Sequence, residues 1–113
     1  NLIFQNLNRI NFVCGSHNEL STLKILNLMS YHNIDVNDNR VWFGQLFGMS
    51  DNISFNLAKS SYNVFKILPF GPVKNLIPYL TRRAQENSSV KGQSGRELNL
   101  IQKEIKRRKL KKL

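Results

Sequence analysis

The chain alternates three short apolar runs with three longer segments whose apolar residues recur at helical spacing. The apolar runs are typical of strands and lie at residues 11–15, 41–47 and 62–68. The segments after them are typical of helices, at residues 19–32, from residue 50 or 51 onward, and at residues 72–87. This alternation predicts an α/β fold, in which crossover helices connect the strands of a parallel sheet. Three such units are too few to close a barrel of eight strands.

The apolar side of each helix predicts which residues face the sheet. The apolar face of the first helix consists of Ile25, Leu26, Leu28 and Met29, and its polar side of Lys24, Asn27 and Tyr31. In the second helix we expect Ile53, Leu57 and Ala58 to point inward. The first strand is apolar in succession, which is typical of a parallel strand covered on both faces. Residues 1–10 give a weak signal for the end of a helix, and residues 33–40 read as a polar loop.

Composition excludes several classes of protein. Hydrophobic residues make up 41% of the 113 residues, as in ordinary globular proteins. No apolar run approaches the roughly 20 residues that a membrane span needs. Cys14 is the single cysteine, so it forms no internal disulfide, and we expect it to be a small buried hydrophobic residue. The chain begins with Asn1 and not with Met, so we expect a piece of a longer protein, and such a piece would not show a targeting peptide.

The net charge of +10 is unevenly distributed. Residues 103–113 hold seven Lys or Arg and one Glu, a local charge of +6, which leaves +4 for the first 102 residues. A solvated basic extension is the first interpretation of this tail, attraction to an anionic membrane surface the second, and nucleic acid the third. We expect the chain to lose regular structure around Gly92, Ser94 and Gly95. Residues 96–113 are then expected to form a last helix with a frayed tip. Leu98, Ile101 and Ile105 would share one side of it.

Residues 69–87 read PFGPVKNLIPYLTRRAQEN. Gly71 and Pro72 end the preceding strand, and Pro72 suits the first turn of the helix that follows. Adjacent residues of a helix point about 100° apart, but two long guanidinium groups can still bind one anion between them. The spacing of Arg82 and Arg83 alone favours a simpler interpretation, a solvated helix end whose cations suit the helix dipole. His17 alone is likewise better explained as a structural histidine. The sequence shows no metal-ligand spacing, serine nucleophile elbow, P-loop or GxGxxG motif.

Three ordered motifs nevertheless resemble one family. PFG followed by PYLTRRAQENSS resembles the C-terminal helix of the FAD-dependent proline dehydrogenases. CGSHN, at residues 14–18, is similar to that family's Thr/Ser-His-Asn strand end, and FGQLFGM, at residues 43–49, to its FGQL-x-GM strand. The resemblance covers about residues 11–90, and the residues of these motifs are most similar to those of the eukaryotic, mitochondrial branch.

The resemblance implies both a fold and an activity. Residues 1–90 would be the last three βα units of a (β/α)₈ TIM-type barrel, and residues 91–113 a basic tail outside it. Enzymes of the family transfer a hydride from the carbon beside the proline nitrogen to the flavin, which yields 1-pyrroline-5-carboxylate, and the reduced flavin passes electrons to quinone. The matrix side of the mitochondrial inner membrane would be the location. This piece alone would be inactive, and its exposed edges and apolar faces would make it prone to aggregate.

The family's site residues carry over onto matching positions. Arg82 and Arg83 would bind the substrate carboxylate, and Tyr79 would pack near the substrate. The residues implied to contact FAD are Ser16, His17, Asn18, Leu46 and Glu86. No residue of the chain is assigned as an acid, base, nucleophile or metal ligand.

Ile67 departs from the family pattern, because many members have Tyr four residues before the glycine that matches Gly71. In hydroxyproline-specific relatives a smaller polar residue stands there. Ile donates no hydrogen bond, so preference for proline over hydroxyproline is open. Three hypotheses follow: a proline dehydrogenase, a hydroxyproline dehydrogenase, or a non-enzymatic basic binding module.

Overall fold

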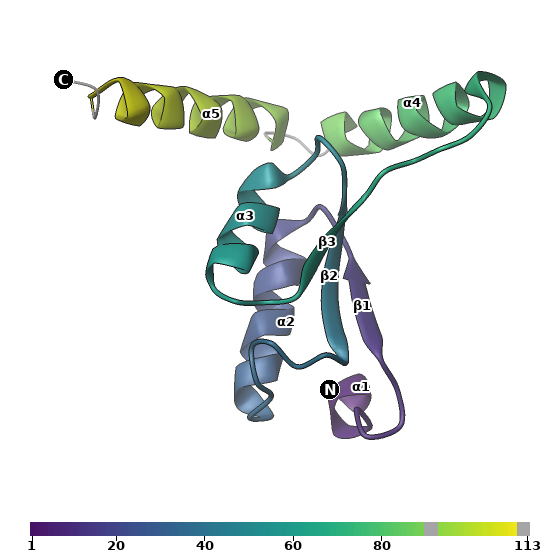
Figure 1. Ribbon diagram of the computed structural model, residues 1–113, viewed down its shortest axis with the longest axis vertical. Coiled ribbons are helices and arrows are strands. Elements are labelled where there is room, and N and C mark those ends of the chain that lie inside the picture. Colours follow the sequence, from purple (N-terminus) through teal and green to yellow (C-terminus); the bar gives the residue numbers. More distant parts are fainter. Residues whose placement is uncertain (90–92, 111–113) are drawn as a thin grey trace. The chain divides into compact units, whose positions relative to one another are not determined.

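The computed structural model of the chain describes residues 1–89 and 93–110. The chain divides into two compact units, Asn1–Leu68 and Pro69–Leu113, and each unit is described by itself. Figure 1 shows the elements of both. Among the described residues, no helix combines the length and apolar character needed to cross a membrane.

The first unit is a three-stranded parallel sheet with helical connections (Figure 1). Its elements are α1 (Leu2–Gln5), β1 (Phe12–Gly15), α2 (Glu19–Tyr31), β2 (Val41–Leu46), α3 (Asp51–Lys59) and β3 (Val64–Ile67). The strand order is β1-β2-β3, and both neighbouring pairs are parallel. The predicted α/β alternation is therefore confirmed for these three strands.

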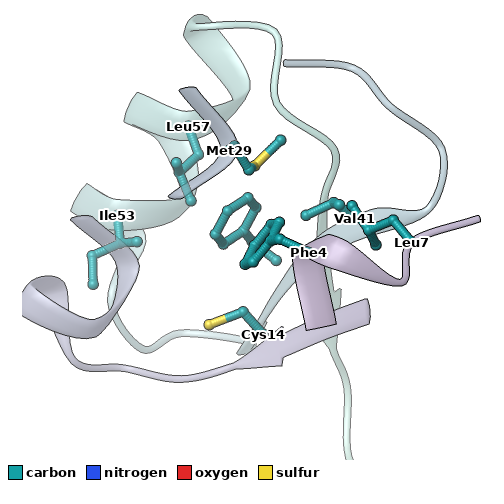
Figure 2. Close-up of a cluster of buried hydrophobic side chains, with 8 residues drawn as sticks. Phe4, Leu7, Cys14, Met29, Val41, Ile53 and Leu57 are labelled. Atoms are coloured by element: carbon teal, nitrogen blue, oxygen red, sulfur yellow. The ribbon is translucent and has the colours of Figure 1, made fainter. Parts of the chain in front are cut away.

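The core is formed by side chains from one face of the sheet, from α2 and α3, and from α1 and the turn after it (Figure 2). The buried cluster consists of Phe4, Leu7, Cys14, Met29, Val41, Phe43, Ile53 and Leu57. Burial raises the pKa of the Cys14 thiol, so this cysteine packs as an unreactive apolar group. Each large side chain buried in this way stabilises the fold by roughly 1.5–3 kcal/mol.

Two burial predictions were wrong. Ala58 is exposed, because it lies about 100° from Leu57 and 140° from Ile53 around α3, outside the apolar stripe. Val13 of β1 is also 55% exposed, so this strand is covered on one face only. Right-handed crossovers running in one direction along a sheet place both helices on the same side, so that neither helix covers the opposite face of these three strands.

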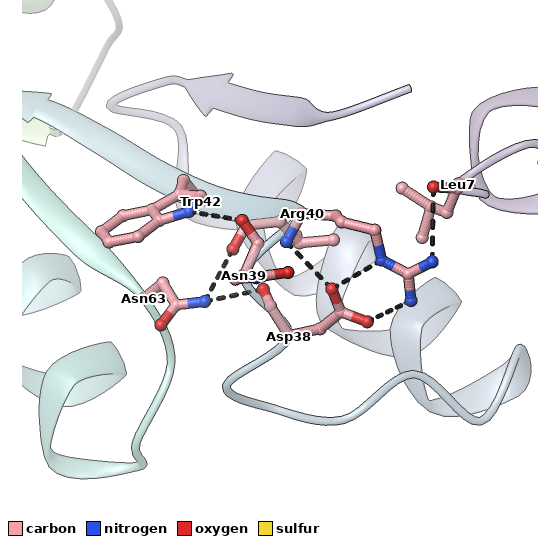
Figure 3. A network of polar contacts seen from close by, with 7 residues as sticks. Leu7, Asp38, Asn39, Arg40, Trp42 and Asn63 are labelled. Atoms are coloured by element: carbon pink, nitrogen blue, oxygen red, sulfur yellow. Dashed lines mark hydrogen bonds and ion pairs between the residues drawn. The ribbon is translucent and has the colours of Figure 1, made fainter. Parts of the chain in front are cut away.

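A polar network joins the beginnings of β2 and β3 (Figure 3). The Asn63 amide donates to the carbonyls of Asp38 and Val41, at 2.7 and 3.2 Å. The Arg40 guanidinium binds the Asp38 carboxylate and donates to the carbonyl of Leu7. The hydrogen bonds from Arg40 lower the pKa of Asp38 to about 2. This network lies at the amino ends of the strands, the end of an α/β sheet that serves stability.

The second unit contains α4 (Val73–Ser89) and α5 (Gln93–Leu110). The Pro72 carbonyl accepts the first hydrogen bonds of α4, from the amides of Asn75 and Leu76. Pro78 lies inside α4 and supplies no amide hydrogen to the helix.

The last helix begins earlier than predicted, at Gln93, and includes Ser94 and Gly95. The cost of one glycine in a helix is only about 1 kcal/mol, which 18 residues offset. Gly92 and the predicted frayed tip at residues 111–113 lie outside the described residues. Within α5, Arg107 and Arg108 bind Glu104 and lower its pKa to about 2.

Candidate functional site

Parallel strands bring the CGSHN and FGQLFGM motifs to one edge of the sheet. Ser16 follows β1 directly and is half-buried, as is His17. Asn18 caps α2, because its side-chain oxygen accepts from the amide of Ser21 at 3.1 Å. The Ser16 hydroxyl oxygen accepts from the amide of Asn18 at 3.1 Å, which fixes the turn between strand and helix.

The imidazole of His17 links β1 to the turn after β2. Its Nδ1 lies 2.9 Å from the Ser50 hydroxyl, and its Nε2 accepts from the amide of Leu46 at 3.4 Å. An amide nitrogen can only donate, so Nε2 is the unprotonated nitrogen and Nδ1 carries the proton of the neutral ring. The structure thus brings His17 and Leu46, two residues predicted to contact FAD, together through a direct hydrogen bond.

Buried Gln45 supports the same edge of the sheet. Its amide nitrogen donates to the Ser16 carbonyl at 3.3 Å, and its oxygen accepts from the Ser54 hydroxyl of α3 at 2.9 Å. Sequence reasoning gave Gln45 no role, although a polar residue at an inward position of an apolar strand would have been the signal.

Lys66 is the second residue that sequence reasoning missed. Its ammonium donates to the carbonyls of Leu46 and Met49, at 3.3 and 2.6 Å, and lies 2.8 Å from the carboxylate of Asp51. A lysine inside the apolar run of the third strand could have indicated it.

Ile67 lies beside Leu46 at the carboxyl edge of the sheet. The two residues are partners in the register of β2 and β3, one position after the pair Gln45 and Lys66. Because successive strand residues alternate between faces, Leu46 and Ile67 lie on the face opposite the helices. Leu46 is buried, whereas Ile67 is 42% exposed. The residue that departs from the family pattern therefore adjoins one predicted to contact the flavin.

On α4, three of the predicted residues form a local group. The Arg83 guanidinium lies 5.6 Å from the centre of the Tyr79 ring and 2.7 Å from the Glu86 carboxylate. The Nε of Arg83 is buried and has no hydrogen-bond partner among the residues that the structure describes. Arg82 points to another side of the helix and is exposed. This group belongs to the second unit, and the group around His17 to the first.

Comparison with known proteins gives one consistent answer. The sequence model of the proline dehydrogenase family matches residues 1–96. The chain belongs to the proline dehydrogenase family. In this family, the hydroxyproline dehydrogenase of Xenopus laevis is 46% identical over 107 residues, which are 95% of this chain and 23% of that protein.

Two mitochondrial members of the proline dehydrogenase family are similar to the chain as well. Proline dehydrogenase 1 of Homo sapiens is 46% identical over 94 residues, 83% of this chain and 16% of that protein. The same enzyme of Caenorhabditis elegans is 41% identical over 99 residues, 88% of this chain and 16% of that protein. The chain thus spans about a fifth of the length of the curated relatives it matches. No solved structure gives a significant match.

Proposed function

We propose that this chain is the C-terminal portion of an FAD-dependent proline dehydrogenase that oxidises L-proline to 1-pyrroline-5-carboxylate in the mitochondrion and passes electrons to quinone. The observation that carries the proposal is the group on α4, where Arg83 lies against Tyr79 and beside Glu86. Residues 1–90 would be the last three βα units of the eight-stranded barrel, and residues 91–113 a basic tail outside it.

The residues at the strand ends fit a flavin in chemical character. Ile67, beside buried Leu46, offers an exposed apolar surface for a flat ring, and Ser16, His17 and Asn18 offer polar groups for the rest of the cofactor. FAD, when bound, would supply the hydride acceptor. The chain's own contribution is to orient substrate and cofactor, which is the usual division of labour in a flavoenzyme.

The arginines suit a small substrate that carries a carboxylate. A guanidinium pairs with a carboxylate through two parallel hydrogen bonds, which fixes the substrate's orientation as well as its position. The Tyr79 ring and Glu86 hold the Arg83 side chain in place before substrate arrives. The unpaired Nε of Arg83 is a donor that a carboxylate would satisfy. A substrate clamped at one end presents its reacting carbon in a fixed geometry.

Hydroxyproline is the second candidate substrate, and Ile67 is the observation that favours it. Ile67 replaces the Tyr that many members of the family have at this position. Its apolar side chain itself gives the hydroxyl group of hydroxyproline no hydrogen bond. The similarity to a hydroxyproline dehydrogenase supports the same alternative. A comparison of kcat/KM for proline and hydroxyproline in the full-length enzyme decides between the two substrates.

The basic tail suggests a further property of the protein, which is contact with an anionic surface such as the matrix side of the inner membrane. The cations of α5 include Lys103, Lys106, Arg107, Arg108 and Lys109. Salt would weaken such a contact, because exposed charges are screened beyond about 8 Å at physiological ionic strength. A binding module without enzymatic activity would need only this tail and none of the residues at the strand ends.

The decisive experiment compares two substrates in two variants of the full-length enzyme. Arg82→Met and Arg83→Met should each raise the apparent KM for proline by one to two decades, since a charge-assisted contact is worth roughly 1.5–3 kcal/mol. The loss should be much smaller for pyrrolidine, which has no carboxylate. Lys74→Met, an exposed cation on the same helix, is the matched control and should behave as wild type. Equal losses for proline and pyrrolidine would show that the arginines are structural and would refute the clamp.

A further inference from the structure

We propose that Lys66 is a positioning residue, whose ammonium group fixes the turn after β2 and, through Ser50, the orientation of the His17 imidazole. This inference rests on the proposed function, in which His17 and Leu46 contact FAD. Lys66 itself would touch neither cofactor nor substrate.

The ammonium of Lys66 is satisfied by three acceptors from one short segment. Two are the carbonyls of Leu46 and Met49, at 3.3 and 2.6 Å, and the third is the Asp51 carboxylate at 2.8 Å. An ammonium group has three hydrogens to donate, so this set uses its full capacity. The side chain of Lys66 is only 23% exposed, which makes it a cross-link inside the structure rather than a surface cation.

The segment that Lys66 holds has an unusual backbone. Gly48 and Ser50 both adopt left-handed conformations, with φ of 77° and 51°. Such a conformation is unfavourable for a serine and persists where surrounding contacts enforce it. The amide of Met49 donates to the Leu46 carbonyl, which Lys66 also contacts, and Met49 presents its own carbonyl to the ammonium. Lys66 therefore stabilises the backbone shape that places Ser50.

The two ends of this turn hold the two nitrogens of His17. The amide of Leu46, at the start of the turn, donates to Nε2, and the Ser50 hydroxyl, at its end, lies 2.9 Å from Nδ1. If the turn relaxed, both contacts would change together. The ammonium of Lys66 thus determines the tautomer and orientation of a histidine on the far strand of the sheet.

The test uses the full-length protein with Lys66→Met, Ser50→Ala, the double variant, and Lys59→Met as an exposed control on α3. Hydrogen exchange of the peptide covering residues 44–52 reports the turn without reference to any cofactor. We expect faster exchange there in Lys66→Met and unchanged exchange in Lys59→Met. The FAD dissociation constant should rise in Lys66→Met, by roughly 10- to 100-fold if the loss matches that seen when a group that orients a metal-ligating side chain is removed.

The double variant separates positioning from general stability. If Lys66 acts through Ser50, the loss in FAD affinity from Ser50→Ala should shrink when Lys66 is already replaced. Independent, multiplying losses would overturn the proposal, and so would unchanged exchange at residues 44–52. If Lys66→Met does not fold, Asp51→Ala removes one exposed acceptor, and unchanged exchange in that variant would count against the proposal.

The proposed role of Lys66 and the proposed function of the protein can be refuted separately. A wild-type protein that binds no FAD would refute the proposed function, while the exchange data would still decide whether Lys66 holds the turn. Faster exchange with unchanged FAD affinity would refute the link from the turn to the cofactor alone.

Discussion

At the scale of single residues, Asp38 is the carboxylate most strongly tied to the folded state of the first unit. Arg40 binds it through side chain and backbone, and these hydrogen bonds lower the pKa of Asp38 from 3.8 to about 2. A carboxylate whose pKa is lower in the folded state stabilises the fold above its unfolded pKa. That contribution is lost as the pH falls from about 4 toward 2.

We therefore predict that Asp38→Asn destabilises the full-length protein at neutral pH by roughly 1 kcal/mol, less than a buried charged pair because Arg40 is partly exposed. The difference from wild type should shrink between pH 4 and pH 2. Urea unfolding at a series of pH values measures it. Asp35→Asn, an exposed carboxylate in the same loop, is the control and should cost little. A difference independent of pH would mean that the amide disrupts packing rather than charge.

The contacts of single side chains were the feature that the sequence predicted least well. His17 and Leu46 were identified because they belong to motifs, yet the hydrogen bond between them depends on a turn with two left-handed residues, which no spacing rule indicates. Lys66 stands in an apolar run, and its three acceptors come from residues 15 to 20 positions earlier. Contacts of this kind depend on strand register, and register is set by the whole sheet.

At the scale of elements, the strands and helices were predictable because their apolar residues follow strong periodicities. The strands and α2 agree with their predicted bounds to within about two residues. The wrong predictions concern residues whose secondary structure or burial depends on the elements around them. Gly95 is helical because it lies within α5, whose other residues favour the helix. Val13 is exposed because α2 and α3 both cover the opposite face of the sheet.

The packing of β2 against β3 depends on a glycine. A Cβ on Gly44 would lie 2.6 Å from the Phe65 ring, whereas a Cβ on Gly15, its register partner on β1, would meet nothing within 4 Å. We predict that Gly44→Ala destabilises the full-length protein by about 1–3 kcal/mol, the usual cost of overpacking. Gly15→Ala should cost less than Gly44→Ala, since a Cβ on Gly15 meets no atom of this chain within 4 Å and alanine loses less entropy than glycine on folding.

Adding Phe65→Leu to Gly44→Ala should recover much of the lost stability, because the smaller side chain leaves room for the new methyl group. Thermal unfolding of the three variants and wild type measures both effects. If Gly44→Ala and Gly15→Ala melted alike, the close approach of the Phe65 ring would not be a feature of the folded protein.

At the scale of the whole molecule, the first unit has a sheet face that neither α2 nor α3 covers, and several apolar side chains on this face are exposed. Val13 and Trp42 are register partners on this face and are 55% and 37% exposed, and Ile67 is 42% exposed. Apolar surface of this kind is normally buried against further structure. In the proposed barrel, the strands contributed by the rest of the protein would enclose it.

We predict that the 113-residue chain expressed alone neither retains FAD nor stays monomeric, whereas the full-length protein does bind FAD. The chain offers polar groups at the end of β1 and apolar residues at the ends of β2 and β3, and the remaining walls of the proposed site would come from the other five βα units. Absorbance near 450 nm after purification, with and without added FAD, together with size-exclusion chromatography, measures both properties. The full-length protein purified in parallel is the control. Flavin absorbance that stays with a monomeric 113-residue chain would show that these three units form a complete cofactor site, and the proposed division of the site between this chain and the rest of the barrel would be wrong.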